Sequence, residues 1–563
     1  MLRSQFLSPH KPVVLFVALL LLASGWALGQ DAPNAYKGLL PGEATRQDVE
    51  KVLGSPPVAT QSDRDFRYPV EDGSGLSDRL YFSGDTLEGV TAASRDPRYP
   101  SREEIVAVFG QPEVEIRFQT QEFLEYSERG LRFICDESGA TIGTVYFPPS
   151  KRRVPASLPH RFDLRRNEAS KASVKPPEDF LVGAAEVSIA PQRFDNLTAD
   201  AEEKPFTLQE DVFARVAIFQ RGETRLVFVG LDVFILGPWD LAPLRKSLAD
   251  KGFPHVLIAM SHTHANVDTM GFYGYYPREY AEHVTRQTEA AVLEAAENMT
   301  RVASVRRGTT EMSLAGGRVV DLILNWRDGG LLNPTVSLIQ AIGQDGRPIV
   351  NLVHLTCHPE VIRLEDKRGI SPDFVGALCR EVSRELGGQT VFLNGALGGM
   401  VSPDVRFRTY EAAAAMGTSL ARFVVDAAQD ARPMGSYDLW IHRRPIEIPV
   451  TAEALVQFLE NAPKPFDYSD GRIRSEMNVV WVGDAQFITV PGELLPQLGI
   501  EIMSHMTGAL RIIAGLTNDE FGYIIPSFDF HEGQYEERTG PGPAAGELVR
   551  TVGLELASMR PEP

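Results

Sequence analysis

Cysteine is scarce in this sequence: the 563 residues include only Cys135, Cys357 and Cys379. Three cysteines are too few for a disulfide scaffold, and none of them belongs to a Cys-x-x-Cys pair. The first of them lies far from the N-terminus, which excludes a lipid-modified cysteine directly after an export signal. We therefore predict three single thiols that are buried in the folded protein.

An excess of positive charge is also missing, because the formal net charge is −19 and no basic stripe stands out. This balance disfavours a nucleic acid as a partner, and we predict none. The absence of a Gly-x-Ser-x-Gly phrase disfavours a serine hydrolase with a nucleophile elbow. After the first thirty residues, no apolar run is long enough to span a bilayer. The remaining composition, 43% hydrophobic and 23% charged, is that of a globular protein.

The N-terminal segment has the features of an export signal. Arg3 and Lys11 precede an apolar stretch over residues 13–28, and the small residues Ala27 and Gly29 suit cleavage before Gln30. We interpret residues 1–29 as a signal peptide, with an uncleaved membrane anchor as the alternative, because the apolar stretch is long for a signal. The mature protein is predicted to be secreted or periplasmic.

Residues 37–150 contain a weak internal repeat. In each copy Thr45 or Ser101 is placed to cap a short amphipathic helix, which a Gly-x-Pro phrase then ends. Segments with alternating apolar and polar residues follow, as is typical of strands. We predict two small α+β units, each with one helix packed on a small antiparallel sheet.

The first copy carries the phrase GLLPGEATRQDVEKVLGSPP. It resembles the helix-plus-sheet module of outer-membrane assembly lipoproteins, which implies a contact with an envelope protein or a membrane surface and no chemistry of its own. A generic small α+β domain is the alternative. Residues 151–178 are rich in Lys, Arg, Pro and Ser, and we interpret them as an exposed linker.

Residues 179–563 show a different pattern, in which apolar, β-branched runs alternate with helical periodicity. Strands that alternate with helices favour an α/β domain. Five of the apolar runs end in compact polar phrases, at residues 261–264, 358–360, 401–404, 491–493 and 517–520. Ligands bind beyond the carboxyl ends of strands in α/β sheets, so these phrases converge on one pocket if the strands have related directions.

The phrase Ser-His-Thr-His at residues 261–264 places two of the chain's 11 histidines one residue apart. On an extended segment both rings point to the same face, whereas at a strand end one ring can bind a metal while the other faces a substrate. Two or three histidines with one glutamate are typical of catalytic zinc, which lowers the pKa of bound water to about 7. A hydrogen-bonded histidine pair without metal is the alternative. His358 and Glu493, at equivalent strand ends, favour the metal.

Seven short phrases of this domain occur in the same order as similar phrases in one known protein family. They stand at residues 182–191, 261–264, 325–327, 357–359, 370–373, 394–404 and 491–493. Together they resemble the N-terminal catalytic domain of the neutral/alkaline (non-lysosomal) ceramidases, zinc-dependent amidases that cut the N-acyl bond of ceramide. The resemblance implies fold class α/β: a large, mixed-sheet domain of the metal-hydrolase type at residues 179–563, preceded by the small α+β domain, with Zn2+ as the cofactor.

The resemblance also implies a set of metal ligands. His262, His358 and Glu493 match the family's metal-binding phrases. The family's fourth ligand is a tyrosine near the end of the domain; we choose Tyr535, with Tyr523 as the second choice and His531 as a substitute.

Further site residues follow from the same resemblance. His264 and Arg327 are expected to contact the substrate carbonyl or headgroup, and Ser402 is expected at the scissile amide. From the residues alone, Ser402 also fits an ordinary turn, because Val-Ser-Pro-Asp is a common capping phrase. The sequence departs from the family at residues 265–267 and at Met400, where the family has an aspartate.

We therefore predict an exported zinc-dependent hydrolase that cleaves the amide bond of ceramide or a related N-acyl lipid. Two other functions stay open. One is a non-catalytic or degenerate envelope binding protein, with the repeats of residues 37–150 as the contact. The other is a metal-dependent deacylase that acts on sugars or peptidoglycan.

Overall fold

The computed structural model describes residues 32–561 apart from short segments, which are 57, 60–64, 72–73, 75, 150–160, 166–173, 195–196, 198–205, 272–275, 316–317, 320–321, 329–330, 364–367, 463 and 465. The predicted signal peptide and much of the predicted linker lie outside the described residues. In the described part of the chain, no helix combines the length and apolar composition that a membrane crossing requires. The three cysteines are buried and unpaired, as predicted.

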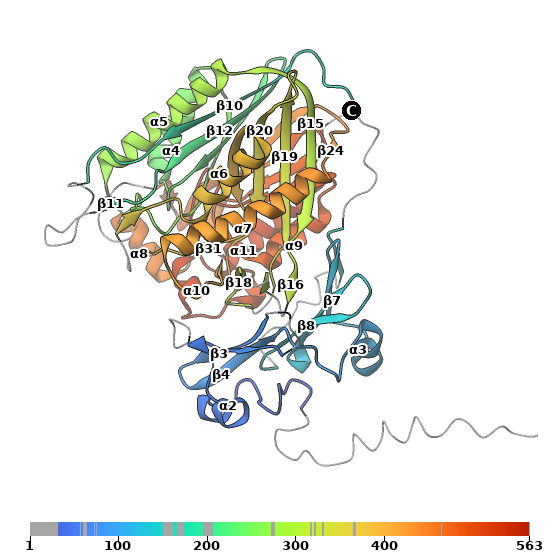
Figure 1. The fold of residues 1–563 in the computed structure, drawn as a ribbon. Helices are drawn as coiled ribbons and strands as arrows, with labels where there is room; N and C mark the ends of the chain where they lie inside the picture. Colours follow the sequence, from blue (N-terminus) through green and yellow to red (C-terminus); the bar gives the residue numbers. More distant parts are fainter. Residues whose placement is uncertain are drawn as a thin grey trace, which may run out of the picture.

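The N-terminal module, residues 32–165, has one sheet that contains the strands of both repeats (Figure 1). The strand order is β1-β2-β3-β4-β8-β7-β6-β5-β9. The repeats join where β4 pairs with β8, so the structure differs from the predicted pair of separate sheets. The strands are β1 (Val58–Ala59), β2 (Asp65–Pro69), β3 (Ser77–Ser83), β4 (Thr86–Ala92), β5 (Val114–Arg117), β6 (Gln121–Tyr126), β7 (Leu131–Asp136), β8 (Thr141–Tyr146) and β9 (Arg161–Asp163). Strand β9 lies within the predicted linker and pairs in parallel with β5.

The two helices of the module begin where the sequence predicts. Helix α2 (Arg46–Leu53) starts after Thr45, whose hydroxyl accepts the N–H of Asp48, and the carboxylate of Asp48 accepts the N–H of Thr45 in return. Helix α3 (Arg102–Phe109) starts after Ser101, which accepts the N–H of Glu104. Both helices pack on the shared sheet around one apolar core.

The large domain contains two mixed sheets that pack face to face. The larger sheet has the order β14-β13-β12-β10-β15-β19-β20-β22, with β24 on β15, and the smaller has the order β25-β27-β28-β30, with β26 on β27. The strands of the larger sheet are β10 (Phe180–Ser188), β12 (Phe213–Arg221), β13 (Thr224–Leu231), β14 (His255–Met260), β15 (Thr300–Glu311), β19 (Thr335–Gly343), β20 (Pro348–Leu355), β22 (Gln389–Asn394) and β24 (Arg432–Pro433). Those of the smaller sheet are β25 (Leu439–Pro449), β26 (Tyr468–Ser469), β27 (Arg472–Val482), β28 (Ala485–Thr489) and β30 (Leu510–Ala514).

Aromatic and aliphatic side chains fill the space between these sheets. The rings of Phe228 on β13 and Phe487 on β28 lie 5.1 Å apart in this core. Strand β22 also packs closely on β13 at Gly230, where a Cβ atom would stand 2.6 Å from the carbonyl oxygen of Phe392. The lack of a side chain at Gly230 therefore allows this contact.

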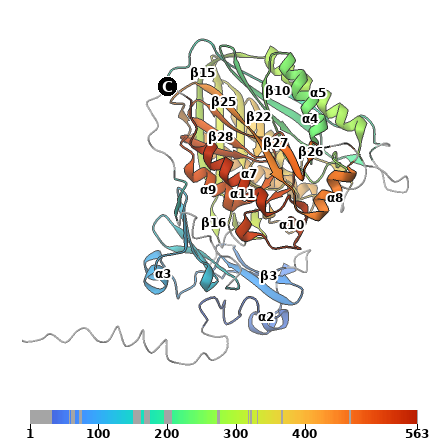
Figure 2. The same cartoon turned by 180° about the vertical axis from the view of Figure 1, so that it is seen from behind.

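Helices cover the outer faces of both sheets. Figure 1 shows α5, α6 and α7 on the larger sheet, and Figure 2 shows α9 and α11 on the smaller one. The helices are α4 (Pro238–Asp250), α5 (Arg278–Glu297), α6 (Phe374–Leu386), α7 (Tyr410–Gln429), α8 (Glu453–Asn461), α9 (Pro496–His505), α10 (Tyr535–Thr539) and α11 (Pro543–Ala557). This arrangement is the predicted α/β class with mixed sheets.

Three small sheets complete the described part of the domain. One has the order β16-β17-β18-β23, and two others pair β29 with β31 and β11 with β21. The strands are β11 (Thr207–Leu208), β16 (Leu314–Ala315), β17 (Arg318–Val319), β18 (Ile323–Asn325), β21 (Gly369–Ile370), β23 (Val401–Pro403), β29 (Glu493–Leu494) and β31 (Tyr523–Ile524). In Figure 1, β16, β18 and α10 lie on the side of the large domain that faces the N-terminal module.

Candidate metal centre

Several of the polar phrases predicted at strand ends meet in the structure, and Asn394, at the end of β22, joins them. Its side-chain N–H groups donate to the carbonyl oxygens of Ser261 and Cys357, which follow β14 and β20. Its backbone carbonyl oxygen accepts the N–H of Gly515, which follows β30. The side chain of Asn394 thus joins the ends of β14 and β20 to that of β22, and its backbone joins the end of β30 in the smaller sheet.

The imidazoles of His262, His264 and His358 form a cluster at this junction. One ring nitrogen from each lies within 4.8 Å of the others. Glu493, the first residue of β29, completes the group: its carboxylate oxygens lie 2.8 Å from Nε2 of His358 and 3.6 Å from Nε2 of His262. The three predicted ligands His262, His358 and Glu493 therefore lie together with His264, the predicted substrate contact. Their roles as ligands stay a prediction.

Backbone carbonyl groups orient two of the imidazoles. Nδ1 of His262 donates to the carbonyl oxygen of Phe234 over 2.9 Å, and Nδ1 of His358 donates to that of Val401 over 3.1 Å. Because a carbonyl can only accept, Nδ1 carries a proton in both rings, and Nε2 is the ring atom that faces the carboxylate of Glu493. The ring of Phe234 also stacks on His262, with centroids 4.7 Å apart.

The charges of these groups depend on burial and on one another. Burial acts to lower the pKa of His358, but the hydrogen bond and charge of Glu493 raise it above the ordinary value. Burial acts to raise the pKa of Glu493, yet His262 and His358 hold it below the ordinary value. For His264, burial and then the neighbouring His262 lower the pKa to about 3, so its ring is neutral at pH 7.

His264 differs from the other two histidines, because one of its ring nitrogens has no hydrogen-bond partner among the described residues. Its backbone N–H donates to the carbonyl oxygen of Pro359, but its Nε2 atom is buried without a hydrogen-bond partner in the described structure. A buried nitrogen without a partner costs free energy, which a bound ion or a substrate atom would offset.

Ser402 stands beside the cluster, in the middle of β23, and is fully buried. No hydrogen bond to its Oγ atom is found among the described residues, and Oε1 of the nearby Glu360 is in the same situation. Burial acts to raise the pKa of Glu360, but its charged neighbours, Arg363 first, lower it to about 2. Glu360 is therefore an ionised carboxylate of the site that the sequence analysis assigned no role, although it ends the phrase at 358–360.

Arg327 pairs with three acidic residues, and its predicted contact with a substrate stays a prediction. Its guanidinium lies 3.2 Å from a carboxylate oxygen of Asp529 and 2.6 Å from oxygens of both Glu536 and Glu537. Asp529 belongs to a short 3-10 helix, residues 527–529, and both glutamates belong to α10. Arg327 thus holds α10 and the preceding 3-10 helix in place.

The structure separates the three candidates for the fourth ligand. Tyr523 on β31 stands opposite Glu493 in the pairing with β29, and it is buried. Tyr535 opens α10 and is 56% exposed, with its ring centroid 6.0 Å from that of Tyr523. His531 is partly exposed and pairs with Asp529 over 3.3 Å. The second choice, Tyr523, is therefore the tyrosine beside Glu493.

The loops around the cluster contain residues with left-handed backbone that are not glycine. They are His262 (φ 69°), Asp373 (φ 56°), Met400 (φ 52°), Leu516 (φ 51°) and Asn518 (φ 68°). Such residues are uncommon, and each costs free energy that the surrounding structure offsets. At His262 this conformation accompanies a backbone hydrogen bond to Val233 and the side-chain bond to Phe234.

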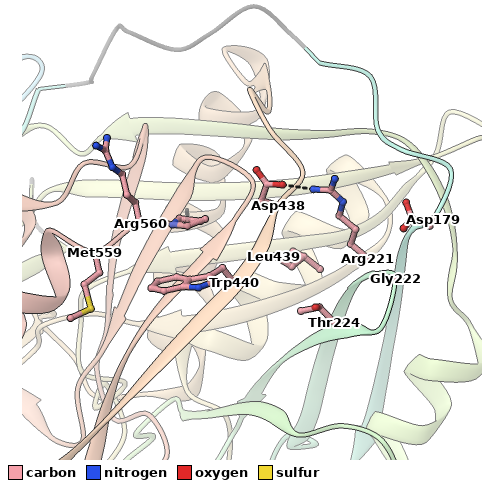
Figure 3. A pocket seen from close by; sticks show the side chains of 10 residues that line it. Asp179, Arg221, Gly222, Thr224, Asp438, Leu439, Trp440, Met559 and Arg560 are labelled. Carbon is pink, nitrogen blue, oxygen red and sulfur yellow. Dashed lines mark hydrogen bonds and ion pairs between the residues drawn. The ribbon is translucent and has the colours of Figure 1, made fainter. Parts of the chain in front are cut away.

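A cavity of about 760 Å3 lies elsewhere in the domain (Figure 3). It is lined by the β12–β13 hairpin, by the start of β25 and by the C-terminal residues Met559 and Arg560, and the ion pair of Arg221 with Asp438 crosses it. The hairpin is at the start of β13, whereas the histidine cluster follows the end of its parallel neighbour β14. The cavity is thus at the opposite end of these strands.

Comparison with solved structures identifies the fold of the large domain. The chain is similar to neutral ceramidase from Pseudomonas aeruginosa, with a TM-score of 0.57 and 13% identity over 68% of this chain and 74% of that chain. A structure of ceramidase complexed with C2 gives a TM-score of 0.57 and 13% identity over 68% of this chain and 75% of that chain. The sequence matches no family model and no curated protein. The fold is therefore ceramidase-like, as the phrases in the sequence predicted, in a divergent chain.

Proposed function

We propose that this protein is a zinc-dependent hydrolase that cleaves the amide bond of ceramide or of a related N-acyl lipid. The observation that carries the proposal is the meeting of His262, His264, His358 and Glu493 on a ceramidase-like fold. We also propose that the protein acts after export, in the periplasm or outside the cell, where the N-terminal module contacts a membrane surface or an envelope protein.

The residues of the cluster fit a zinc ion. Two imidazole nitrogens and a carboxylate oxygen are donors that zinc prefers, and two carbonyl groups fix the tautomers that leave both Nε2 atoms available. His262, His358 and Glu493 would hold the ion, with Tyr523 next to Glu493 as the further oxygen donor. When bound, zinc supplies a Lewis acid that polarises a carbonyl group and lowers the pKa of water.

The remaining side chains would bind and orient the substrate. The neutral His264 can form one hydrogen bond through Nε2, and the O–H group of Ser402 can donate to the same substrate group. Glu360 is ionised and accepts hydrogen bonds, so it serves to orient a donor such as Ser402 or the substrate amide. Preorganised donors of this kind stabilise charge that develops on a carbonyl oxygen.

Metal content and N-acyl hydrolysis together test this proposal. Purified wild-type protein is expected to contain about one zinc ion per chain and to hydrolyse fluorogenic N-acyl lipids. His262→Ala is expected to lose both, while His505→Ala, an exposed histidine on α9, keeps both. Hydrolysis that survives complete removal of metal would refute the mechanism. A wild-type protein without bound metal would favour the binding protein instead.

A further inference from the structure

The N-terminal module inserts two arginines into the large domain beside the candidate centre. Arg79 on β3 forms an ion pair with Asp404, and Nη1 of Arg132 on β7 lies 2.9 Å from the carboxylate of Asp328. Both arginines are 2% exposed or less. They occupy corresponding places in the two repeats, since each directly precedes a core residue of the module, Leu80 or Phe133.

The first arginine acts at the base of β23. Asp404 directly follows this strand and is fully buried, and it also accepts Arg67 of the module over 2.5 Å. Two residues before Asp404 is Ser402. Three residues before it is Val401, whose carbonyl oxygen accepts both the backbone N–H of His358 over 2.7 Å and its Nδ1 over 3.1 Å. Strand β23 thus connects Asp404 to the carbonyl group of Val401, which orients His358.

The second arginine acts on the segment next to β23. Asp328 adjoins Arg327, and its N–H donates to the side chain of Asn325, which pairs with Val401 between β18 and β23. Arg79 contacts this segment as well, because its guanidinium lies 4.4 Å from the ring centroid of Trp326. The two arginines therefore hold two adjoining segments of the site from the same side.

The module has other contacts that keep it in place. The side chain of Gln121 donates to the carbonyl oxygen of Met312 over 3.2 Å and accepts the N–H of Leu314 over 2.9 Å. The carboxylate of Glu311 accepts the N–H and hydroxyl of Thr120. A buried ion pair adds little net stability compared with apolar packing, and its best-supported use is to specify geometry. The contacts of Gln121 and Thr120 involve neither arginine, so they remain to hold the module in place when Arg79 or Arg132 is replaced.

We propose that the N-terminal module is a positioning element of the candidate centre, and that Arg79 and Arg132 are the positioning residues through which it acts. Arg79 fixes β23, and with it Ser402 and the ring of His358. Arg132 fixes residues 325–328, which pair with β23. The proposal rests on the proposed function for its catalytic consequence, but the geometric role of the two arginines can be measured without any substrate.

The test compares Arg79→Gln, Arg79→Lys and Arg132→Gln with Arg98→Gln in the full-length protein. Arg98→Gln controls for the loss of an arginine from the module, because the ion pair of Arg98 with Asp96 lies within the module. Two readouts are used: hydrogen exchange of peptides that cover residues 322–328 and 399–405, and kcat and KM for an N-acyl lipid. The glutamine variants at 79 and 132 are expected to exchange faster in these peptides. They are also expected to lose about 10- to 100-fold in kcat, with KM within about twofold of wild type.

Arg79→Lys keeps the charge and is expected to restore part of kcat, whereas Arg98→Gln is expected to change neither readout. Exchange in Arg132→Gln that equals the wild-type rate would overturn the proposal, as would an equal effect of Arg98→Gln. If Arg79→Gln does not fold, a double-mutant cycle with Arg132→Gln and Asp328→Asn decides, and additive effects on exchange count against the proposal. A wild-type protein without N-acyl hydrolysis refutes only the proposed function, since the exchange measurement still decides the positioning role.

Discussion

Nε2 of His358 lies 2.8 Å from a carboxylate oxygen of Glu493, although 135 positions of the chain separate the two residues. His358 follows a strand of the larger sheet, and Glu493 follows a strand of the smaller one. The candidate metal centre therefore exists only where the two sheets are packed in register. A change that shifts one sheet on the other alters the centre even if it touches no ligand.

Tyr523 and Tyr535 give opposite expectations for the same substitution. Tyr523→Phe removes a buried hydroxyl opposite Glu493 and is expected to lower zinc affinity or activity by about 10- to 100-fold. Tyr535→Phe alters an exposed side chain and is expected to leave both unchanged. Zinc titration and N-acyl hydrolysis measure the difference. A loss in Tyr535→Phe alone would return the fourth-ligand assignment to Tyr535.

Arg327→Gln is expected to lower the stability of the protein as its main effect. The variant leaves Asp529, Glu536 and Glu537 without their shared cation. Removal of one partner from a buried ion pair costs about 3–5 kcal/mol. Thermal unfolding should therefore show a large drop in the melting temperature. A variant with wild-type stability and a raised KM would instead support the substrate contact that the sequence predicted.

Asp519 is expected to make the protein less stable as the pH rises from 4 to 7. Burial is the main cause that raises its pKa to about 7, whereas an unfolded chain has an aspartate pKa of about 3.9. Between these values only the folded state holds the proton, so stability decreases with pH by up to about 4 kcal/mol and then stays level. Asp519→Asn removes this penalty. Unfolding at pH 4.5 and pH 8 should show a gain only at the higher pH, with Asp250→Asn on the surface as the control for lost charge. An equal gain at both values would contradict the expectation.

The cap of helix α2 offers a test of the N-terminal module alone. Thr45→Ala removes the hydroxyl that accepts the N–H of Asp48 and is expected to lower the unfolding free energy of the module by about 1 kcal/mol. Thr45→Asn keeps an acceptor and should preserve stability. Limited proteolysis of the module measures the difference between the variants. Equal protection in both variants would show that the cap contributes nothing.

Local chemistry explains which parts of this structure the sequence predicts. Thr45 and Ser101 begin their helices, because a capping hydroxyl and the helix it serves lie within four residues. The meeting of His262, His358 and Glu493 was predictable, because each belongs to a polar phrase that follows an apolar run and so marks a strand end. The general fold follows from the same alternation of strands and helices.

The features that the sequence did not predict depend on interactions between distant segments of the chain. The pairing of β4 with β8, which unites the repeats, joins residues far apart, and no local pattern specifies it. The carboxylates that surround Arg327 come from α10 and the 3-10 helix before it, so a sequence phrase shared with a family could not reveal them. The choice between Tyr523 and Tyr535 depended on the path of one loop. Only the fold shows that the first is buried and the second exposed.

The left-handed backbone at His262, Met400 and Leu516 implies a conflict between durability and activity. Glycine at Met400, a half-buried position, would relax the local conformation and leave the histidines in place, whereas at the fully buried Leu516 the lost core packing would outweigh the relief. Directed evolution for heat resistance alone should therefore accumulate replacements in these loops, and the most heat-resistant descendants should be the poorest catalysts.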